Sequence, residues 1–396
     1  MTVQMEGLAE FAQVPVRHGI SRVSPGDGAA RVDWDDGHVS AFHWVWLRDN
    51  CGCPDCTHPV TLERMVDILS WPEDIHPESL SLAGDGALEI VWSDGGHVSR
   101  FGPGWLRAHC YSADAHAARR RALLPWGAEL GNDLPAMRCA DVMDGDAGVL
   151  TWLRHLRDRG IAMVRGVPVD EGRVKRVAER IGPVRGTNFG AVFDVVSMPK
   201  PNSNAYTALP LPPHTDLPYR EQEPGYLFLH CLHNEATGGD SLLVDGFRIA
   251  QALRDDDPDS FETLCRVRFS FGFKDELTDF HLRVPVIALD EYGDLREIRF
   301  NQFTAAPFDV GGDQMPAAYR AWRRFAALTT DRRFLLRLRL RSGDLISFDN
   351  RRVLHARTAF DPASGRRHLQ GCYVDREEAD CRLRVLERPN GTMASG

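Results

Sequence analysis

Apolar and polar residues alternate in two similar stretches of the first third of the chain. The first stretch, residues 32–42, surrounds an Asp-Asp-Gly turn and leads into Trp46-Leu-Arg. The second, residues 91–101, surrounds an Asp-Gly-Gly turn and leads into Trp105-Leu-Arg. Such alternation is typical of a β-hairpin, because successive side chains of a strand point to opposite faces. The sequence therefore predicts two related hairpins, each followed by a short helix, in a small β-rich domain.

Farther along the chain, helical periodicity marks three segments: residues 149–159, 173–181 and 314–328. Most other apolar segments have the length of strands: residues 161–164, 226–231, 241–244, 266–273, 295–300 and 344–348. The strands do not alternate with helices, and no Gly-x-Gly-x-x-Gly or phosphate-loop motif occurs. The pattern predicts an α+β fold that is mainly β, an antiparallel sandwich or jelly roll rather than a doubly wound sheet.

A change of composition separates the two regions. Residues 113–123 are rich in Ala and Arg without strand alternation, and a segment with Pro and Gly follows through Pro135. A chain of 396 residues also exceeds what one ordinary core holds. We expect an amino-terminal domain at residues 1–115, a linker at 116–135 and a larger domain at 136–396.

The composition is that of a soluble globular protein. Hydrophobic residues make up 43% of the chain and charged residues 26%, and the formal net charge is -9 with the basic residues dispersed. This charge argues against nucleic acid as a partner. No apolar run approaches the roughly 18 residues of a membrane span, and residues 1–10 lack the pattern of a secretory signal. We expect a cytoplasmic protein without a membrane partner.

Three cysteines crowd into Cys51-Gly-Cys53-Pro-Asp-Cys56, a spacing too tight for an ordinary disulfide framework. In a reducing compartment three thiolates predict a structural Zn²⁺ site that needs one more ligand, although an unmetallated loop or redox-active thiols are alternatives. A closed site of four ligands should stabilise rather than catalyse. Three histidines compete for the fourth place: His58 nearby, and His38 and His97 at equivalent places in the two hairpins.

A second metal site is indicated by His214 and Asp216, which stand two positions apart. On a strand this spacing puts both side chains on one face, where they can bind one ion. His355, which follows the predicted strand 344–348, supplies a third ligand. Two histidines and one carboxylate occupy one face of an octahedral Fe(II) and leave three positions open. The alternative is a chance His-x-Asp pair.

Two arginines, Arg366 and Arg367, follow His355 at the distance of a short hairpin. A 2-oxoglutarate that chelates iron at one end needs a buried cation for its far carboxylate, and arginine is a permanently charged, bidentate partner. The ligands and the arginine pair together favour 2-oxoglutarate and O₂ as cosubstrates.

Ordered motifs span nearly the whole chain: Trp46-Leu-Arg-Asp-Asn-Cys51, Ala205-Tyr-Thr207, His214-Thr-Asp216, residues 237–246, residues 348–355 and residues 367–375. With these motifs the chain resembles the family of γ-butyrobetaine dioxygenase and trimethyllysine dioxygenase, in the taurine dioxygenase superfamily of Fe(II)- and 2-oxoglutarate-dependent oxygenases. The resemblance implies a double-stranded β-helix (jelly roll) catalytic domain behind the small zinc-binding domain. It also implies a homodimer.

The resemblance assigns roles to several polar residues. It implies that Arg367 binds 2-oxoglutarate, with Arg366 as the nearest alternative, and that the hydroxyl of Ser241 lies beside the same carboxylate. It also favours His97 over His38 as the zinc ligand. The residues alone leave both choices open.

Members of this family hold a quaternary ammonium in an aromatic cage, because a desolvated cation is attracted to ring faces. The resemblance places four aromatic residues at the cage positions: Phe189, Phe193, Tyr206 and Tyr373. Two phenylalanines here replace a tyrosine and a tryptophan, and core packing is an alternative role for both. For the anionic end of the substrate, the family uses amide side chains. Asn301 matches one of them, whereas Ser203 stands at the other, next to Asn204.

The sequence thus predicts a dioxygenase that hydroxylates a small trimethylammonium-bearing substrate, with γ-butyrobetaine, which yields L-carnitine, as first choice. Trimethyllysine, a trimethylammonium phosphonate or another small zwitterion is the alternative, because Ser203 departs from the family pattern. A different class of function is a catalytically dead metal-binding interaction protein. A halogenase is set aside, because that chemistry needs a small residue in place of Asp216.

Overall fold

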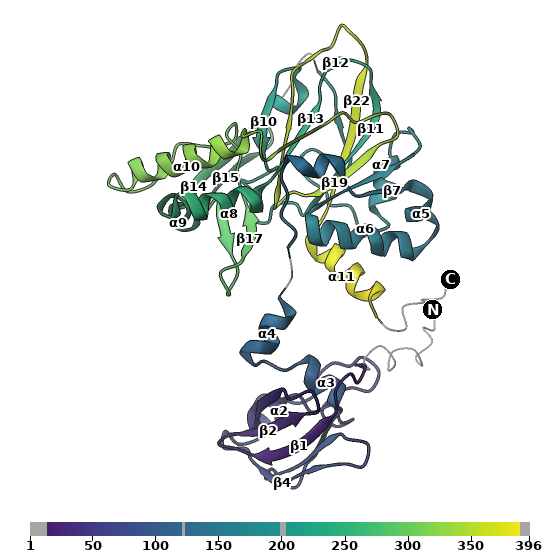
Figure 1. Cartoon of the computed structure of the whole chain (residues 1–396), viewed down its shortest axis with the longest axis vertical. Coiled ribbons are helices and arrows are strands. Elements are labelled where there is room, and N and C mark those ends of the chain that lie inside the picture. Colours follow the sequence, from purple (N-terminus) through teal and green to yellow (C-terminus); the bar gives the residue numbers. More distant parts are fainter. Residues whose placement is uncertain (1–13, 121–122, 199–202, 389–396) are drawn as a thin grey trace. The chain divides into compact units, whose positions relative to one another are not determined.

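The computed structural model describes residues 14–120, 123–198 and 203–388, shown in Figure 1. These residues fall into two compact units that divide near residue 121. Among the helices of the described ranges, none combines the length and the hydrophobicity that crossing a membrane takes.

The amino-terminal unit contains six strands: β1 (Ile20–Pro25), β2 (Ala29–Trp34), β3 (Val39–His43), β4 (Pro77–Leu82), β5 (Leu88–Trp92) and β6 (Val98–Phe101). They form two antiparallel sheets, β1-β2-β3 and β4-β5-β6. A short helix follows each sheet: α2 (Trp44–Asp49) and α3 (Pro103–Ala108), and α4 (Ala113–Arg119) comes next. The hairpin turns place Gly37 and Gly95 at φ 83° and 90°, a region that glycine enters without steric cost. The predicted pair of hairpins, each followed by a short helix, is confirmed.

The repeat extends to hydrogen bonds inside this unit. The two sheets share one apolar core, and its members include the buried rings of Trp34, Phe42, Trp92 and Phe101. In the first sheet, Trp34 Nε1 donates a 2.9 Å hydrogen bond to Ser40 Oγ. In the second, Trp92 Nε1 donates one of 2.8 Å to Ser99 Oγ. Equivalent positions in the two copies therefore do equivalent structural work.

The larger unit is built on ten strands: β7 (Ala136–Arg138), β8 (Ile161–Arg165), β9 (Phe193–Val195), β10 (Leu211–His214), β11 (Tyr226–Asn234), β13 (Ser241–Asp245), β18 (Leu335–Leu338), β19 (Leu345–Asp349), β20 (Val353–Arg357) and β22 (Arg367–Val374). Six of them form a sheet in the order β7-β8-β19-β11-β22-β9, and four form a second sheet in the order β10-β20-β13-β18. Every neighbouring pair is antiparallel except β7 and β8. This arrangement confirms the predicted jelly roll.

Helices and two-stranded sheets complete the larger unit: α5 (Cys139–Asp144), α6 (Asp146–Arg159), α7 (Arg173–Ala178), α8 (Gly246–Asp256), α9 (Pro258–Arg266), α10 (Met315–Thr329), α11 (Arg376–Leu386), β12 (Thr237–Gly238) with β21 (Phe360–Asp361), β14 (Phe269–Lys274) with β15 (Asp279–Val284), and β16 (Ile287–Leu289) with β17 (Leu295–Ile298). In Figure 1, α6 and α7 lie beside the six-stranded sheet, whereas α8, α9 and α10 gather at the other end of the unit.

The long central strand β11 separates two cores. Tyr226 and Phe228 belong to the apolar cluster that includes buried residues of α6 and α7. Leu227 and Cys231 belong to the cluster between the two sheets. Because side chains alternate along a strand, one segment can be buried on both faces. The face that carries Leu227 borders the cavity described below.

The structure corrects part of the helix prediction. Helices α6, α7 and α10 lie where periodicity predicts helices, but α8, α9 and α11 were not predicted. The predicted strand 266–273 was wrong at its start, because α9 continues through Arg266 and β14 begins at Phe269. Signals for α9 were present: the side chain of Asp257 caps the helix by accepting from Ser260 N, and Pro258 occupies its first turn.

The segment 116–135, which we predicted as a linker, is not uniform. It begins inside α4, whereas Trp126 is buried in the core of the larger unit. The indole of Trp126 donates a 2.8 Å hydrogen bond to Arg159 O, and its backbone N–H donates one of 3.0 Å to Asp245 Oδ2. The later part of the segment thus packs as part of the jelly roll.

Candidate active site

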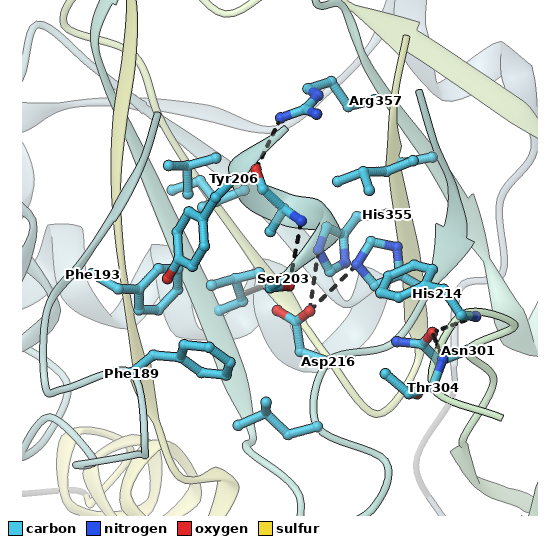
Figure 2. A pocket seen from close by; sticks show the side chains of 18 of the residues that line it. Phe189, Phe193, Ser203, Tyr206, His214, Asp216, Asn301, Thr304, His355 and Arg357 are labelled. Carbon is cyan, nitrogen blue, oxygen red and sulfur yellow. Dashed lines mark hydrogen bonds and ion pairs between the residues drawn. The ribbon is translucent and has the colours of Figure 1, made fainter. Parts of the chain in front are cut away.

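Strand pairing brings the three predicted iron ligands together. Strands β10 and β20 run antiparallel with His214 opposite His355, and Asp216 follows β10 by two residues. Asp216 Oδ1 lies 3.4 Å from His214 Nε2 and 3.6 Å from His355 Nε2. One ligand atom from each residue lies within 4.8 Å of the others. This grouping can hold one metal ion, and Figure 2 shows the carboxylate of Asp216 directed at both imidazoles.

The backbone at Asp216 is held by contacts on both sides. Asn350 Oδ1 accepts a 2.7 Å hydrogen bond from Asp216 N, and Asn350 Nδ2 donates one of 3.1 Å to Asp216 O. The next residue, Leu217, adopts φ 54°, a left-handed conformation that is strained for a residue with a side chain. Such strain persists only where the surroundings enforce it. The Asn350 clamp is one such constraint, so the carboxylate is placed before any ligand arrives.

Hydrogen bonds prepare the donor atoms for a metal. His214 Nδ1 donates to Pro212 O at 2.9 Å, which leaves the lone pair on Nε2. Burial, reinforced by neighbouring His214, lowers the pKa of His355 to about 3, so this imidazole is neutral at physiological pH. The hydroxyl of Tyr373 donates a 2.8 Å hydrogen bond to Asp216 Oδ2. Two imidazoles and a carboxylate are the donor set of an open Fe(II) site.

Asp216 stays ionised although it is buried. Burial alone raises the pKa of a carboxyl, but His355, His214 and the Tyr373 hydroxyl outweigh it here and hold the pKa of Asp216 well below its usual range. The acid is therefore an anion at neutral pH. A buried carboxylate beside two imidazoles attracts a metal cation.

Arg367 lies in the wall of the cavity that these residues share. Its side chain donates one long hydrogen bond, from Nη2 to Gly239 O at 3.4 Å, while Nε and Nη1 are buried without a hydrogen-bond partner. Burial lowers the pKa of Arg367 to about 10, which still leaves a full positive charge at neutral pH. Unpaired buried N–H groups are costly, so this guanidinium is arranged for an anionic ligand. The alternative, Arg366, is exposed and outside the cavity wall.

A second buried arginine, Arg357, was not predicted as a site residue. Its guanidinium donates to the backbone carbonyls of Ala205, Thr207 and Leu209 at 2.6 to 3.3 Å. The ring of Phe360 lies between the two cations, 4.9 Å from the Arg357 guanidinium carbon and 5.2 Å from that of Arg367. Ser241 also lines the cavity and pairs with Arg357 across β13 and β20. In the sequence, the available signal for Arg357 was its position two residues after the ligand His355.

All four predicted cage residues line this cavity: Phe189, Phe193, Tyr206 and Tyr373. The ring centroids of Phe193 and Tyr373 lie 5.3 Å apart, and those of Phe189 and Tyr206 lie 6.3 Å apart. Figure 2 shows Phe189, Phe193 and Tyr206 on the side of the cavity away from His214. Sequence analysis missed several further lining residues: Tyr219, Phe273, Phe303 and Thr304.

The residues expected at the anionic end of the substrate are placed unequally. Ser203 and Asn301 line the cavity, whereas Asn204 is exposed and outside its wall. The hydroxyl of Ser203 accepts a 3.3 Å hydrogen bond from Ala205 N. The side-chain oxygen of Asn301 accepts from Phe303 N and Thr304 N at 3.1 and 3.2 Å. Both side chains therefore already shape the local backbone.

The amino-terminal unit holds a separate cluster of metal-binding side chains: Cys51, Cys53, Cys56 and His97. His97 Nε2 lies 3.3, 3.7 and 3.5 Å from the three sulfur atoms in that order. Arg48 donates to Cys56 Sγ at 3.5 Å and forms a 2.8 Å ion pair with Asp94. The four ligand atoms, at these separations, fit a tetrahedral site around one metal ion.

The competing histidines have other contacts. His38 Nε2 lies 3.4 Å from Cys110 Sγ, which also lies 3.1 Å from Ser40 Oγ. His58 Nδ1 accepts from the backbone N–H groups of Val60 and Thr61. Each hairpin histidine thus meets the cysteine that follows the other hairpin, and only one of these pairs has further cysteines beside it.

Comparison with known proteins agrees with this geometry. Residues 119–373 match the family described as Taurine catabolism dioxygenase TauD, TfdA family, and residues 22–107 match the family described as Gamma-butyrobetaine hydroxylase-like, N-terminal. The chain is 46% identical over 385 residues to the gamma-butyrobetaine dioxygenase of Pseudomonas sp. strain AK-1, an alignment that covers 96% of this chain and 100% of that protein.

Two further similarities were found. Over 387 residues the chain is 30% identical to the trimethyllysine dioxygenase of Meyerozyma guilliermondii, which covers 93% of this chain and 96% of that protein. The crystal structure of AAD-2 in complex with Mn(II) and N-oxalylglycine has a TM-score of 0.50 at 13% identity, covers 64% of this chain and 97% of that chain, and supports the fold alone. The chain belongs to the taurine catabolism dioxygenase TauD, TfdA family, and it is an Fe(II)- and 2-oxoglutarate-dependent dioxygenase, as its sequence predicted.

Proposed function

We propose that the protein hydroxylates a small trimethylammonium-bearing substrate, with γ-butyrobetaine as the first candidate and L-carnitine as its product. The observation that carries this proposal is the buried guanidinium of Arg367, whose Nε and Nη1 have no hydrogen-bond partner, in the same cavity as His214, Asp216 and His355. A metal triad and an anion receptor in one cavity suit a cosubstrate that chelates at one end and is charged at the other. The relative from Pseudomonas sp. supports the choice of substrate.

In this proposal, His214, Asp216 and His355 hold Fe(II), and Arg367 binds the far carboxylate of 2-oxoglutarate beside the hydroxyl of Ser241. The bound iron and cosubstrate supply the oxidative chemistry, in which 2-oxoglutarate becomes succinate and CO₂ while O₂ provides the hydroxyl oxygen. The protein contributes placement and water exclusion. Apolar side chains that line the cavity support the latter role: Val195, Leu211, Leu217, Leu227, Leu229 and Leu369.

The aromatic wall supports a cationic substrate. Ring faces attract a quaternary ammonium, which cannot be satisfied by hydrogen bonds. The hydroxyl of Tyr373 is engaged with Asp216, so its ring rather than its oxygen is available to the substrate. Among the described residues of the cavity wall, Asp216 is the one carboxylate. A trimethylammonium group at the rings is therefore recognised by aromatic faces rather than by an ion pair.

A substrate panel tests this proposal. Purified protein with Fe(II), ascorbate and 2-oxoglutarate is given γ-butyrobetaine, trimethyllysine, a trimethylammonium phosphonate or no substrate, and succinate and hydroxylated product are measured. We expect stoichiometric succinate and carnitine with γ-butyrobetaine. Turnover of trimethyllysine alone would move the assignment to that substrate, a choice for which the relative from Meyerozyma guilliermondii gives grounds. If no quaternary ammonium is oxidised, the substrate class is wrong. If 2-oxoglutarate also fails to bind, the interaction-protein alternative takes its place.

We propose separately that Cys51, Cys53, Cys56 and His97 hold a structural Zn²⁺. Four ligands leave no position for a substrate, so this ion stabilises the unit instead of reacting. Elemental analysis of protein purified without chelator should find one zinc per chain in addition to iron. Protein that is folded, active and free of zinc would contradict this assignment.

We also propose a cytoplasmic homodimer. None of the nine cysteines of the chain forms a disulfide in the structure, which agrees with a reducing compartment. The resemblance to the γ-butyrobetaine dioxygenase family supports the dimer. Light scattering coupled to size exclusion should give about twice the 44.3 kDa mass of the chain, and a monomer at micromolar concentration would exclude it.

A further inference from the structure

One buried hydroxyl in the cavity wall has no hydrogen-bond partner. Thr304 lines the cavity, and its Oγ1 is shielded from solvent without a donor or acceptor nearby. The backbone of the same residue is fully engaged: its N–H donates to Asn301 Oδ1 at 3.2 Å, and its carbonyl accepts from Gly272 N at 2.8 Å. A buried hydroxyl left unpaired costs free energy, so a ligand group that pairs with it is stabilised.

Hydrogen bonds connect Thr304 to the metal ligands. Asn301 Nδ2 donates to Thr215 O at 3.1 Å, and Thr215 N donates to Phe300 O at 2.8 Å. Thr215 lies between His214 and Asp216 in the chain. The turn that carries Thr304 is therefore fixed relative to the triad. A substrate group bound to the hydroxyl has a defined position with respect to the metal.

Asn301 itself has little capacity left for a substrate. Its side-chain oxygen accepts two backbone hydrogen bonds, and its amide donates one to Thr215, so one amide hydrogen remains. The geometry makes Asn301 the residue that shapes the turn and Thr304 the residue that presents a free donor. Figure 2 shows both on the side of Asp216 opposite to Phe189 and Phe193.

The charges of the cavity leave the wall that carries Thr304 with neutral donors. The cations among the lining residues are Arg357 and Arg367, and we have assigned Arg367 to 2-oxoglutarate. The two Nη atoms of the Arg357 guanidinium donate to three backbone carbonyls, which leaves its buried Nε as the one nitrogen without a partner. At the wall opposite to the aromatic rings, the donors are neutral. A substrate head group at that wall is therefore held by hydrogen bonds rather than by an ion pair.

We infer that the hydroxyl of Thr304 is the specificity-determining donor to the anionic head group of the substrate, with Asn301 as the residue that positions it. This inference rests on the proposed function. It adds a donor for the head group in a cavity where Ser203 replaces an amide side chain of the family, and it makes the distance between Thr304 and the aromatic wall the measure of substrate length.

The test compares Thr304→Val, which removes the hydroxyl and keeps the shape, with Thr304→Ser, which keeps the hydroxyl. The KM for γ-butyrobetaine should rise about 10-fold or more in the valine variant, the loss expected when a hydrogen bond to a charged group is removed, and it should return to near wild type in the serine variant. Butyltrimethylammonium, which has no carboxylate, serves as the probe of the aromatic wall. Its inhibition constant and the KM for 2-oxoglutarate should be unchanged in both variants.

Thermal melting separates binding from a structural role. Because Thr304 Oγ1 has no partner, Thr304→Val should leave the melting temperature of the ligand-free protein unchanged or slightly higher. The matched control is Thr329→Val on α10, which removes a buried hydroxyl that donates to Ala326 O at 2.7 Å. That variant should melt earlier and keep its KM values.

Two results would overturn the inference. An unchanged KM for γ-butyrobetaine in Thr304→Val would show that the hydroxyl does not touch the head group. If the inhibition constant of butyltrimethylammonium rises together with the KM for γ-butyrobetaine, the substitution has distorted the cavity as a whole. Neither result touches the proposed function, which fails instead if the wild-type protein does not oxidise γ-butyrobetaine at all.

Discussion

Two of the clusters of metal-binding side chains among the described residues differ in how they close. In the amino-terminal unit, three cysteines from one short loop and His97 bring four ligand atoms together. In the jelly roll, His214, Asp216 and His355 bring three, and the cavity beside them contains buried N–H and O–H groups without partners. The first cluster supplies all four ligands of a tetrahedral ion. The second leaves coordination positions and hydrogen-bonding groups for other ligands.

This difference teaches how to separate a stabilising site from a reactive one without any ligand present. A closed site has no free coordination position, so its ion can only stabilise the fold. An open site contains buried hydrogen-bonding groups without partners, and these groups lie where the ligands of the site bind. Arg367 and Thr304 hold that capacity at separate places in the cavity wall. The five predictions below probe this contrast, beginning with the largest effect.

Removing a ligand from the open site should abolish chemistry and spare the fold. In Asp216→Ala, we expect substrate-dependent succinate release to fall by more than about 1,000-fold, because iron loses one of its protein ligands. The metal-free variant should still fold, because the jelly roll has its own apolar core, but it should melt somewhat earlier, because a carboxylate with a lowered pKa stabilises the folded state. Asp290→Ala, in an exposed turn of the larger unit, is the control and should keep full activity. An active Asp216→Ala variant would refute the triad.

Removing a ligand from the closed site should do the reverse. Structural zinc contributes roughly 10–16 kcal/mol to the folding of zinc-finger peptides. Cys56→Ser should therefore lose zinc and leave the amino-terminal unit unfolded, which limited proteolysis and circular dichroism would detect. The jelly roll has its own core and should still bind 2-oxoglutarate. Retention of stoichiometric zinc in this variant would show that the site does not need its fourth ligand.

The arginine pair offers a sharper test of the open site. Arg367→Met should raise the KM for 2-oxoglutarate by about 10- to 100-fold, because one charge-assisted, bidentate contact is lost. Arg366→Met changes a neighbouring but exposed guanidinium and should leave this KM unchanged. Steady-state kinetics in 2-oxoglutarate at saturating substrate measure both. Equal effects in the two variants would remove the assignment of Arg367.

Tyr373 joins the aromatic wall to the triad, and its two roles can be separated. Tyr373→Phe keeps the ring and removes the 2.8 Å hydrogen bond to Asp216. We expect iron affinity to fall about 10-fold, the usual cost of losing a group that orients a metal ligand. The inhibition constant of butyltrimethylammonium should change little. Titration with Fe(II) under anaerobic conditions measures the first effect, and an unaltered iron affinity would reduce Tyr373 to a wall residue.

The smallest effect is expected at the counterpart of the closed site. The pair formed by His38 and Cys110 has the geometry of His97 and Cys51 but no additional cysteines beside it. Cys110→Ala should keep zinc at one per chain and cost about 1 kcal/mol of folding stability. Chemical denaturation measures this loss. A fall in zinc content would mean that the two halves share one metal site.

Sequence reasoning reached the elements whose signals are local. The hairpins, the helices with glycine ends and the spacing of His214 and Asp216 each depend on neighbouring residues. The third ligand, His355, followed from the antiparallel fold class. The role of Asn301 did not follow, because sequence does not reveal that its side-chain oxygen is occupied by Phe303 N and Thr304 N. Contacts made by a buried side chain depend on the final packing.

The choice between His38 and His97 shows the same limit. The equivalence of the two histidines is visible in the sequence. The sequence does not show that each histidine contacts the cysteine of the other copy. In the structure each histidine meets the cysteine after the other hairpin, so the three cysteines that follow the first hairpin select the histidine of the second. Helices α8 and α9 were missed for another reason. Their capping residues are present in the sequence, but we interpreted the apolar run that follows them as a strand.

The crossing of the two hairpins also has a kinetic consequence. Cys56 and His97 are 41 positions apart, so the metal site cannot close until both hairpins exist. During synthesis, the first hairpin must therefore wait for the second, and its thiolates stay open to oxidation or to the wrong ion in the interval. The proposed zinc site and the shared apolar core both take residues from the two hairpins, so neither half can complete the domain alone.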